Sequence, residues 1–279
     1  MNEKTSSSLS CLHFGHYIAG TYDPVIAATD AALDSFATKT GFSFPRWEDG
    51  LNVMIPKKPG VNLVTKLRTI LLYEADFNKI NKMMGREMMN FAETHQLLTP
   101  EQYGSRKFHS AQDQSLNKTL TFDIYRQSKD RCGLCCVDLK SCYDRMVHAA
   151  CSMSMRRCGC PPELIKTSFQ TIQNLRHFVR TKYGDSKEFF AAKKGDIPIQ
   201  GVGQGNGAGP AEWAVVSTPI FNSMRHRGYG IYLENPLSGG QFQFVGYAFV
   251  NDTDLVFGDI PGDHRPQSLI PTIQQSMVW

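Results

Sequence analysis

Three short segments constrain the fold of this 279-residue chain more than any other feature. The first is an apolar run, 133–137, that ends at the carboxylate of Asp138. The second is a glycine-dense loop, 201–210, which precedes an apolar helical stretch. The third places Asn251 and Asp252 between two alternating apolar runs, the pattern of a β-hairpin. Together they predict strands and helices that place polar side chains at the ends of strands.

Each segment has an ordinary structural interpretation and a functional one. An acid at a strand end, such as Asp138, is often a helix N-cap, but it can also hold a hard cation that prefers oxygen ligands. A glycine-dense loop is often a flexible surface loop, but its backbone N–H groups can approach a phosphate or a nucleotide base closely. Asn and Asp tolerate positive φ, so the pair at 251–252 could be turn chemistry alone.

Composition limits the class of protein. Hydrophobic residues make up 41% and charged residues 20%, which is typical of a globular chain. No apolar run approaches the roughly 18 residues of a membrane span, and the polar start at Met1 does not resemble a signal peptide. We therefore expect an intracellular protein, nuclear or cytoplasmic and not secreted, with reduced cysteines and no membrane partner.

Positive charge is concentrated in one stretch. Residues 46–86 contain eight basic and four acidic side chains, whereas residues 1–45 contain two basic and four acidic ones. Such a local excess fits a polyanionic partner such as nucleic acid, although scattered surface lysines give the same pattern.

Apolar periodicity and turn residues predict the remaining elements. Helices are expected at 24–36, 75–93, from just after Asp138 to 157, 162–179 and 210–224. Strands are expected at 51–56, 67–73, 133–137, 178–183, 188–192, 242–250 and 253–257.

The order of the three segments resembles the palm of reverse transcriptases, especially those of non-long-terminal-repeat retrotransposons. Asp138 matches the metal-binding Asp of that family's first motif, and Tyr143 matches the aromatic residue that checks the sugar of the incoming nucleotide. The sequence Gly201-x-x-Gln204-Gly205, with Pro210 after it, resembles the second motif, and Phe249-x-Asn251-Asp252 resembles the third. Upstream, residues 56–60, 67–70 and 102–104 are similar to segments of the fingers.

The resemblance implies an α+β fold, that of a right-hand polymerase with fingers and palm, in which helices back an antiparallel palm sheet. It implies an N-terminal extension at 1–45, fingers at 46–125, and a palm at 126–279 with a fingers-like insertion at about 160–195. The chain is expected to stop before a thumb, as a fragment or a decayed copy of a longer element protein. The oligomeric state stays open.

The implied activity is RNA-directed DNA polymerisation, in which two Mg²⁺ ions, or Mn²⁺, bridge the primer 3′-hydroxyl and the triphosphate. By resemblance Asp138 and Asp252 supply the carboxylates, and the Leu139 carbonyl is an additional metal ligand. Lys57, Lys58 and Arg68 would neutralise the phosphates of the deoxynucleoside triphosphate. Gln204 and Gly205 would flank the template base and the incoming nucleotide. The implied partners are an RNA template and a DNA primer.

One departure from the family pattern bears on activity. Asn251 stands where the family has an aspartate that binds the metals, and an amide oxygen carries no formal charge. We therefore expect an impaired polymerase. The alternatives are an inactive remnant that only binds nucleic acid, and an RNA-dependent RNA polymerase. Tyr143 argues against the latter because it would clash with a ribose 2′-hydroxyl.

Two cysteine- and histidine-containing patterns invite a zinc interpretation. Cys132-x-x-Cys135-Cys136 lies in the strand that leads to Asp138, where small thiols pack well, and His13-x-x-His16 lacks a further ligand nearby. Both are better interpreted as structural.

Overall fold

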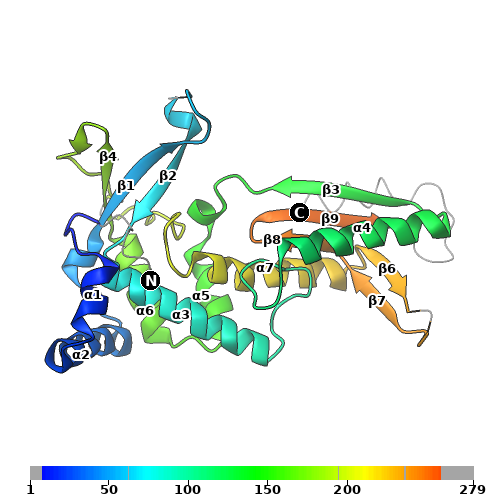
Figure 1. Ribbon diagram of the computed structural model, residues 1–279, viewed down its shortest axis with the longest axis horizontal. Helices are drawn as coiled ribbons and strands as arrows, with labels where there is room; N and C mark the ends of the chain where they lie inside the picture. Colours follow the sequence, from blue (N-terminus) through cyan, green and yellow to red (C-terminus); the bar gives the residue numbers. More distant parts are fainter. Residues whose placement is uncertain (1–7, 62, 194, 236, 259–279) are drawn as a thin grey trace. The chain divides into compact units, whose positions relative to one another are not determined.

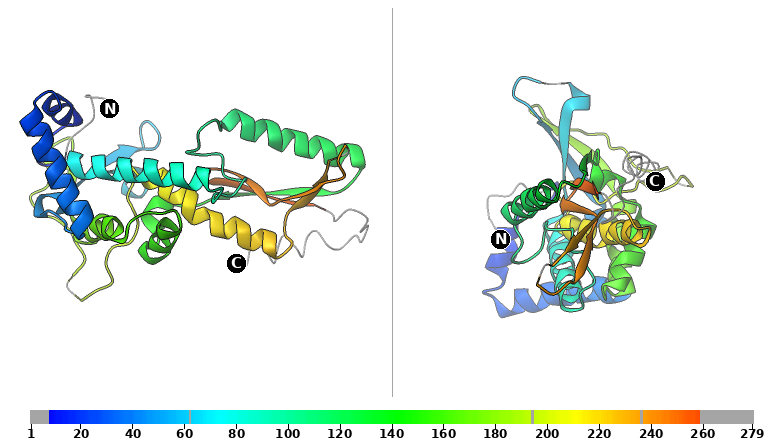
Figure 2. Two further views of the ribbon diagram at one scale, coloured as in Figure 1. Left: turned by 90° about the horizontal axis from the view of Figure 1, so that it is seen from below. Right: turned by 90° about the vertical axis from the view of Figure 1, so that its right-hand side faces the viewer.

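The computed structural model describes residues 8–61, 63–193, 195–235 and 237–258 (Figures 1 and 2). The end of the expected palm, residues 259–279, lies outside the described ranges. The chain divides into two compact units, each assembled from separated stretches. Met1–Phe91 and Tyr143–Glu212 form the first unit, and Ala92–Cys142 and Trp213–Trp279 form the second. The expected division at residues 46 and 126 stays a prediction.

The first unit contains a mixed sheet in the order β2-β1-β4-β5. Its strands are β1 (Asp49–Pro56), β2 (Leu67–Leu72), β4 (Arg176–Thr181) and β5 (Gly184–Asp185). Its helical segments are α1 (Phe14–Gly20), α2 (Pro24–Thr40), α5 (His148–Arg157) and α6 (Pro162–Gln173), with the short 3₁₀ turns η1 (Pro45–Glu48) and η2 (Val64–Lys66). The 3₁₀ turn η3 (Cys142–Arg145) begins on the last residue of the preceding second-unit stretch. The antiparallel β1–β2 hairpin agrees with the sequence prediction, whereas β4 pairs in parallel with β1.

Two predicted helices of this region are wrong. The helix expected at 162–179 ends at Gln173, because the following residues pair with β1 as strand β4. The helix expected just after Asp138 is a 3₁₀ turn followed by α5. There the carbonyls of Tyr143 and Met146 accept hydrogen bonds from Val202 and Gly201, at 2.8 and 2.9 Å, instead of from a continuing helix. In both cases tertiary pairing overrides local propensity.

The second unit contains an antiparallel sheet in the order β3-β9-β8 and a separate β6-β7 hairpin. The strands are β3 (Cys132–Asp138), β6 (Ile231–Glu234), β7 (Gln241–Phe244), β8 (Gly246–Phe249) and β9 (Asp252–Gly258). The long helices α3 (Ala75–Thr94) and α7 (Gly209–His226) each cross a unit boundary, and α4 (Ala111–Ser128) lies wholly in the second unit. Within the described ranges, no helix is long and apolar enough to cross a membrane.

The two faces of the β3-β9-β8 sheet pack against different helices, so that the sheet lies between α4 and the second-unit part of α7 (Figure 2, left). On one face, Val256 packs in a cluster with Tyr125 of α4. On the other, Phe257 packs with Phe221 and Met224 of α7. Because side chains alternate along a strand, the face toward α4 also takes residues 252 and 254 of β9.

Helix α4 was not predicted, although its start is visible in the sequence. Ser110 and Asp113 form a capping box, in which each side chain accepts from the other residue's backbone N–H. The apolar strand before Asp138 is the edge strand β3, and most of its residues are only partly buried.

Candidate active site

Asp138 and Asp252 meet at the end of the β3-β9-β8 sheet. Asp138 is the last residue of β3, Asp252 is the first residue of β9, and the two are direct partners in the antiparallel register. Opposed residues of such a pair point to the same face, with Cβ atoms about 5 Å apart. Both residues are exposed. The two carboxylates, 114 positions apart in the sequence, are thus brought together at one exposed strand end.

Asp138 is not a helix N-cap, the ordinary interpretation of an acid in this position. The nearest helical segment, the 3₁₀ turn η3, begins four residues later at Cys142, and the residue that precedes α5 is Val147. The carboxylate therefore has no capping role that would explain it.

The β8–β9 turn does not use Asn251 and Asp252 for their tolerance of positive φ. Phe249 pairs with Asp252, which leaves Val250 and Asn251 as a two-residue turn. Val250 is the residue with positive φ, 58°, a conformation that a β-branched side chain rarely adopts. Turn chemistry alone therefore does not account for this Asn-Asp pair.

The strained peptide of Val250 is held by a buried side chain, Gln102. The Gln102 Oε1 accepts from the Val250 N–H at 2.9 Å, and its Nε2 donates to the Val250 carbonyl at 3.1 Å. Trp213 Nε1 donates to the same carbonyl at 2.6 Å. A Cβ on Gly104 would lie 2.3 Å from the Val250 nitrogen, so the chain needs glycine there. The 102–104 segment, compared above with the fingers, thus fixes the turn that carries Asn251.

We expect Gln102→Met to destabilise the second unit by about 2–3 kcal/mol, because it leaves the N–H groups of Val250 and Gly104 without the Gln102 Oε1 that accepts from them. The measurement is the free energy of unfolding from denaturant titration. Gln112→Met, at an exposed position of α4, is the matched control and should change that free energy little. Equal stability of both variants would contradict the role given to Gln102.

A further acid, Asp254, lies on the same face one pleat beyond Asp252, and none of the sequence motifs considered above includes it. It pairs across the sheet with Cys136, and Lys118 Nζ donates to its Oδ2 at 2.7 Å. Burial raises the pKa of Asp254, but the hydrogen bonds of Cys136 and Lys118 outweigh it and leave the pKa below its ordinary value. The Asp-x-Asp spacing of 252 and 254 would have placed both on one face of a strand.

The donors at this strand end suit a hard cation only in part. Carboxylate and carbonyl oxygens are the ligands that Mg²⁺ and Mn²⁺ prefer. Within the described residues, no three His, Cys, Asp or Glu side chains surround one metal position. Asp138 and Asp252 would therefore need further oxygens, and the Asn251 amide and the Leu139 carbonyl are adjacent in sequence to them. Two carboxylates, an amide oxygen and a carbonyl oxygen are donors of the kind that a divalent metal site uses.

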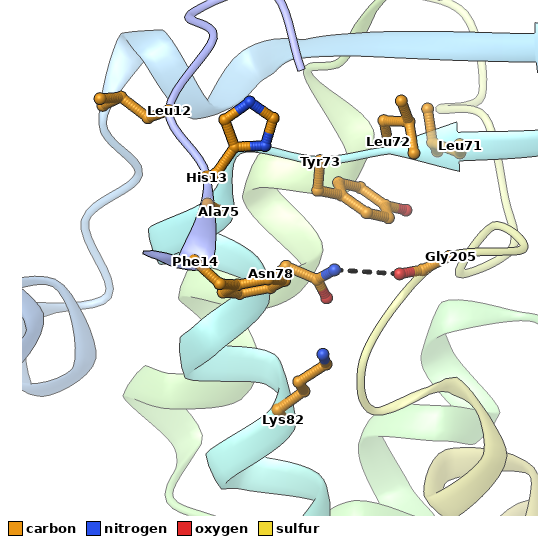
Figure 3. A pocket seen from close by; sticks show the side chains of 10 residues that line it. All are labelled: Leu12, His13, Phe14, Leu71, Leu72, Tyr73, Ala75, Asn78, Lys82 and Gly205. Atoms are coloured by element: carbon orange, nitrogen blue, oxygen red, sulfur yellow. Dashed lines mark hydrogen bonds between the residues drawn. The ribbon is translucent and has the colours of Figure 1, made fainter. Parts of the chain in front are cut away.

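In the first unit, the glycine-dense loop is tightly held and is not a flexible surface loop. The Leu71 N–H donates to the Gln204 carbonyl at 2.7 Å, and a Cβ on Gly205 would lie 2.1 Å from the Leu71 oxygen. Asn78 donates to the Gly205 carbonyl at 3.0 Å (Figure 3) and accepts from the Gly207 N–H at 2.6 Å. The glycines therefore permit close backbone contact with β2 and α3.

A cavity of about 270 Å³ adjoins Gly205. Figure 3 shows Phe14, Asn78 and Lys82 around it, together with residues of β2. The Lys82 ammonium lies 4.4 Å from the centre of the Phe14 ring. The cavity thus combines a cation, an amide and apolar walls.

Tyr143 lies in η3 beside the start of α7. A Cβ on Gly209 would be 3.5 Å from the Tyr143 ring, which is an ordinary van der Waals contact. Lys57, Lys58 and Arg68 are exposed at the β1–β2 hairpin, and none of them forms an ion pair with another described residue. All six expected substrate-binding residues, including Gln204 and Gly205, belong to the first unit, whereas 138, 139, 251 and 252 belong to the second.

Comparison with known proteins assigns the family. Residues 55–249, well over half of the chain, match the family model of reverse transcriptase (RNA-dependent DNA polymerase). The match ends just before Asn251. No curated protein matches the chain by sequence.

Solved telomerases share the fold. The chain is similar to apo telomerase from Candida tropicalis truncated from its C-terminal domain, with a TM-score of 0.52 and 12% identity, over 91% of this chain and 52% of that one. It is also similar to telomerase from Candida albicans in complex with a TWJ fragment of telomeric RNA, with a TM-score of 0.51 and 9% identity, over 91% of this chain and 43% of that one. The chain thus spans about half the length of these polymerases or less. It belongs to the reverse transcriptase (RNA-dependent DNA polymerase) family.

Proposed function

We propose that this chain is the fingers and palm of a retrotransposon reverse transcriptase of the non-long-terminal-repeat type. It would add deoxynucleotides to a DNA primer on an RNA template, at a rate reduced by Asn251. The observation that carries the proposal is the register of β3 and β9, which opposes Asp138 to Asp252 at an exposed strand end. Family membership supports the reaction class.

The carboxylates of Asp138 and Asp252, with the Asn251 amide and the Leu139 carbonyl, would hold two Mg²⁺ ions, or Mn²⁺. When bound, such ions stabilise the attacking 3′-hydroxyl oxygen and the leaving pyrophosphate. The two hydrogen bonds between Gln102 and Val250 fix the β8–β9 turn. Asn251 and Asp252 are therefore already positioned before the reaction begins.

Residues of the first unit would bind the substrates. Lys57, Lys58 and Arg68 are exposed cations without ion-pair partners among the described residues, and they would neutralise the triphosphate. Gln204 and Gly205 would contact the template base and the incoming nucleotide, and Lys82, in the cavity of Figure 3, would contact the template backbone. The RNA bound by the Candida albicans telomerase supports an RNA template for this chain.

The test is primer extension on an RNA template with Mg²⁺ and deoxynucleoside triphosphates. Asp252→Asn should abolish the extension that the chain supports, because it leaves one carboxylate at the strand end. The second candidate, a remnant that only binds nucleic acid, is favoured by the uncharged Asn251. If the chain is such a remnant, both the unmodified chain and the Asp252→Asn variant should bind template–primer in a salt-sensitive way, and neither should extend the primer.

Tyr143 should exclude ribonucleotides. We expect Tyr143→Ala to raise the ratio of ribonucleotide to deoxynucleotide incorporation by about tenfold or more, because the aromatic ring no longer meets the 2′-hydroxyl. Parallel single-nucleotide extensions measure this ratio, with Tyr183→Ala, at an exposed tyrosine, as the control. An unchanged ratio would remove Tyr143 from the sugar site and reopen the RNA polymerase alternative.

A further inference from the structure

Asp254 continues the row of polar side chains that begins at the paired carboxylates of Asp138 and Asp252. The register opposes Asp254 to Cys136, two positions along each strand from the carboxylate pair. Side chains two positions apart on a strand point to the same face of the sheet. The Asp254 carboxylate therefore lies on the same face as the two exposed acids, and its side chain is only 18% exposed.

Two side chains hold the Asp254 carboxylate in one orientation. Lys118, which belongs to α4, donates from its Nζ to Asp254 Oδ2 at 2.7 Å. The Cys136 thiol donates a second hydrogen bond to the same carboxylate. The two oxygens of a carboxylate offer about four acceptor sites, so two donors leave capacity for another. Asp254 is thus fixed in place and can still accept a hydrogen bond.

The ordinary interpretation of the Lys118–Asp254 ion pair is that it ties α4 to the sheet. Other contacts already do this, because Tyr125 of α4 packs in a buried cluster with Val256 of β9. Asn117 of α4 also donates to the Tyr103 hydroxyl at 2.9 Å. A partly exposed ion pair adds little to stability. Helix packing therefore does not explain why this acid lies beside the carboxylate pair.

Asp254 is placed to meet the water of a metal ion instead of the ion itself. Strand geometry separates the Cα atoms of residues 252 and 254 by about 6.5–7 Å. Among the residues that the structure describes, no three acidic, His or Cys side chains surround one metal position. Mg²⁺ usually keeps several waters, with metal–oxygen distances of about 2.1 Å. With one hydrogen bond of about 2.8 Å, such a water bridges about 7 Å between two carboxylate oxygens.

We propose that Asp254 is a positioning residue of the metal site, which accepts a hydrogen bond from a water on the ion held by Asp138 and Asp252. Its negative charge offsets part of the charge that Asn251 lacks. Lys118 keeps the Asp254 carboxylate in the orientation that this hydrogen bond needs. The inference rests on the proposed function, because it requires a divalent ion at this strand end.

The experiment is an Mn²⁺ titration of the full chain without template or nucleotide, followed by the electron paramagnetic resonance signal of free Mn²⁺. Asp254→Asn should weaken Mn²⁺ binding about tenfold, since loss of a group that hydrogen-bonds to metal ligands costs about 10–100-fold in affinity. Asp123→Asn removes the same charge from an exposed ion pair of α4 with Arg126, and it should bind Mn²⁺ as the unmodified chain does. Thermal melts without metal check that each variant is folded.

Lys118→Met separates support of the metal from a structural role of the ion pair. It breaks the same pair as Asp254→Asn does, but it leaves the carboxylate held by Cys136 and removes a cation near the site. The variant should therefore bind Mn²⁺ at least as tightly as the unmodified chain. Equal weakening by Lys118→Met and Asp254→Asn would overturn the proposal, and so would an unchanged Mn²⁺ affinity of Asp254→Asn.

Two further variants complete the test. If Asp254→Asn alone does not fold, the double variant with Lys118→Met leaves no unpaired cation, and it should bind Mn²⁺ about tenfold more weakly than Lys118→Met. Asp252→Asn should remove most of the binding, because it removes one of two carboxylate ligands. Binding that depends on Asp252 but not on Asp254 would refute only the role of Asp254. Binding that depends on neither residue would refute the proposed metal site as well.

Discussion

Replacing Asn251 with aspartate should raise the rate of primer extension by about 10–100-fold or more. Substitution of residues that only hydrogen-bond to metal ligands already lowers metal affinity or activity by about 10–100-fold. A substitution at a residue beside the metals should change the rate by at least the same factor. Asp138 and Asp252 are direct partners across β3 and β9, and Asn251 precedes Asp252 in the β8–β9 turn. A third carboxylate there would restore the charge that two neighbouring divalent cations require.

The same substitution should change the response to metal in the absence of substrate. Three carboxylates at one strand end repel each other, so Asn251→Asp should lower the melting temperature without metal and gain more from added Mn²⁺ than the original chain does. Asn222→Asp is the matched control, since it adds the same charge at an exposed position of α7. A folded Asn251→Asp protein whose extension rate is unchanged would contradict the role of residue 251.

The sequence alone predicted the strand end of Asp138 and the hairpin of Asp252. It did not predict the contacts that hold the β8–β9 turn in place. A strand ending in Asp138 and a hairpin at Asn251-Asp252 are local patterns, and they predicted elements that the structure contains. The hydrogen bonds between Gln102 and Val250 join residues that are 148 positions apart in the sequence. The positive φ of Val250 is opposite to the negative φ that a β-branched residue prefers. Neither could be inferred without the packing of the second unit.

The first unit shows the same limit. The β1–β2 hairpin was predictable because its turn residues are local. The parallel pairing of β1 with β4 was not, because parallel strands are joined by long connections whose partners carry no local signal. The burial of Glu212 also has no local signal in the sequence. The residue lies next to an ordinary helix start, and yet it is fully buried.

Glu212→Gln should make the protein more stable at pH 8, with little effect near pH 4. Glu212 is fully buried in the first turn of α7, and neither carboxyl oxygen has a partner within the described residues. The helix dipole favours a negative charge there, but burial outweighs it and raises the pKa of Glu212 to about 8. Between pH 4.5 and 8 the folded chain therefore holds a proton that the unfolded chain has lost.

Stability must then fall as pH rises through this window, because the folded state binds more protons than the unfolded state. The loss is absent below the ordinary pKa of 4.5 and reaches about 3–5 kcal/mol at pH 8. The Glu212→Gln variant has no carboxyl proton to lose at this position, so its free energy of unfolding should vary less with pH by that amount. Denaturant titrations at several pH values measure the difference. Glu188→Gln, at an exposed acid, should follow the original chain. Parallel pH profiles for the Glu212→Gln variant and the original chain would show that the Glu212 carboxyl group is not held protonated by burial.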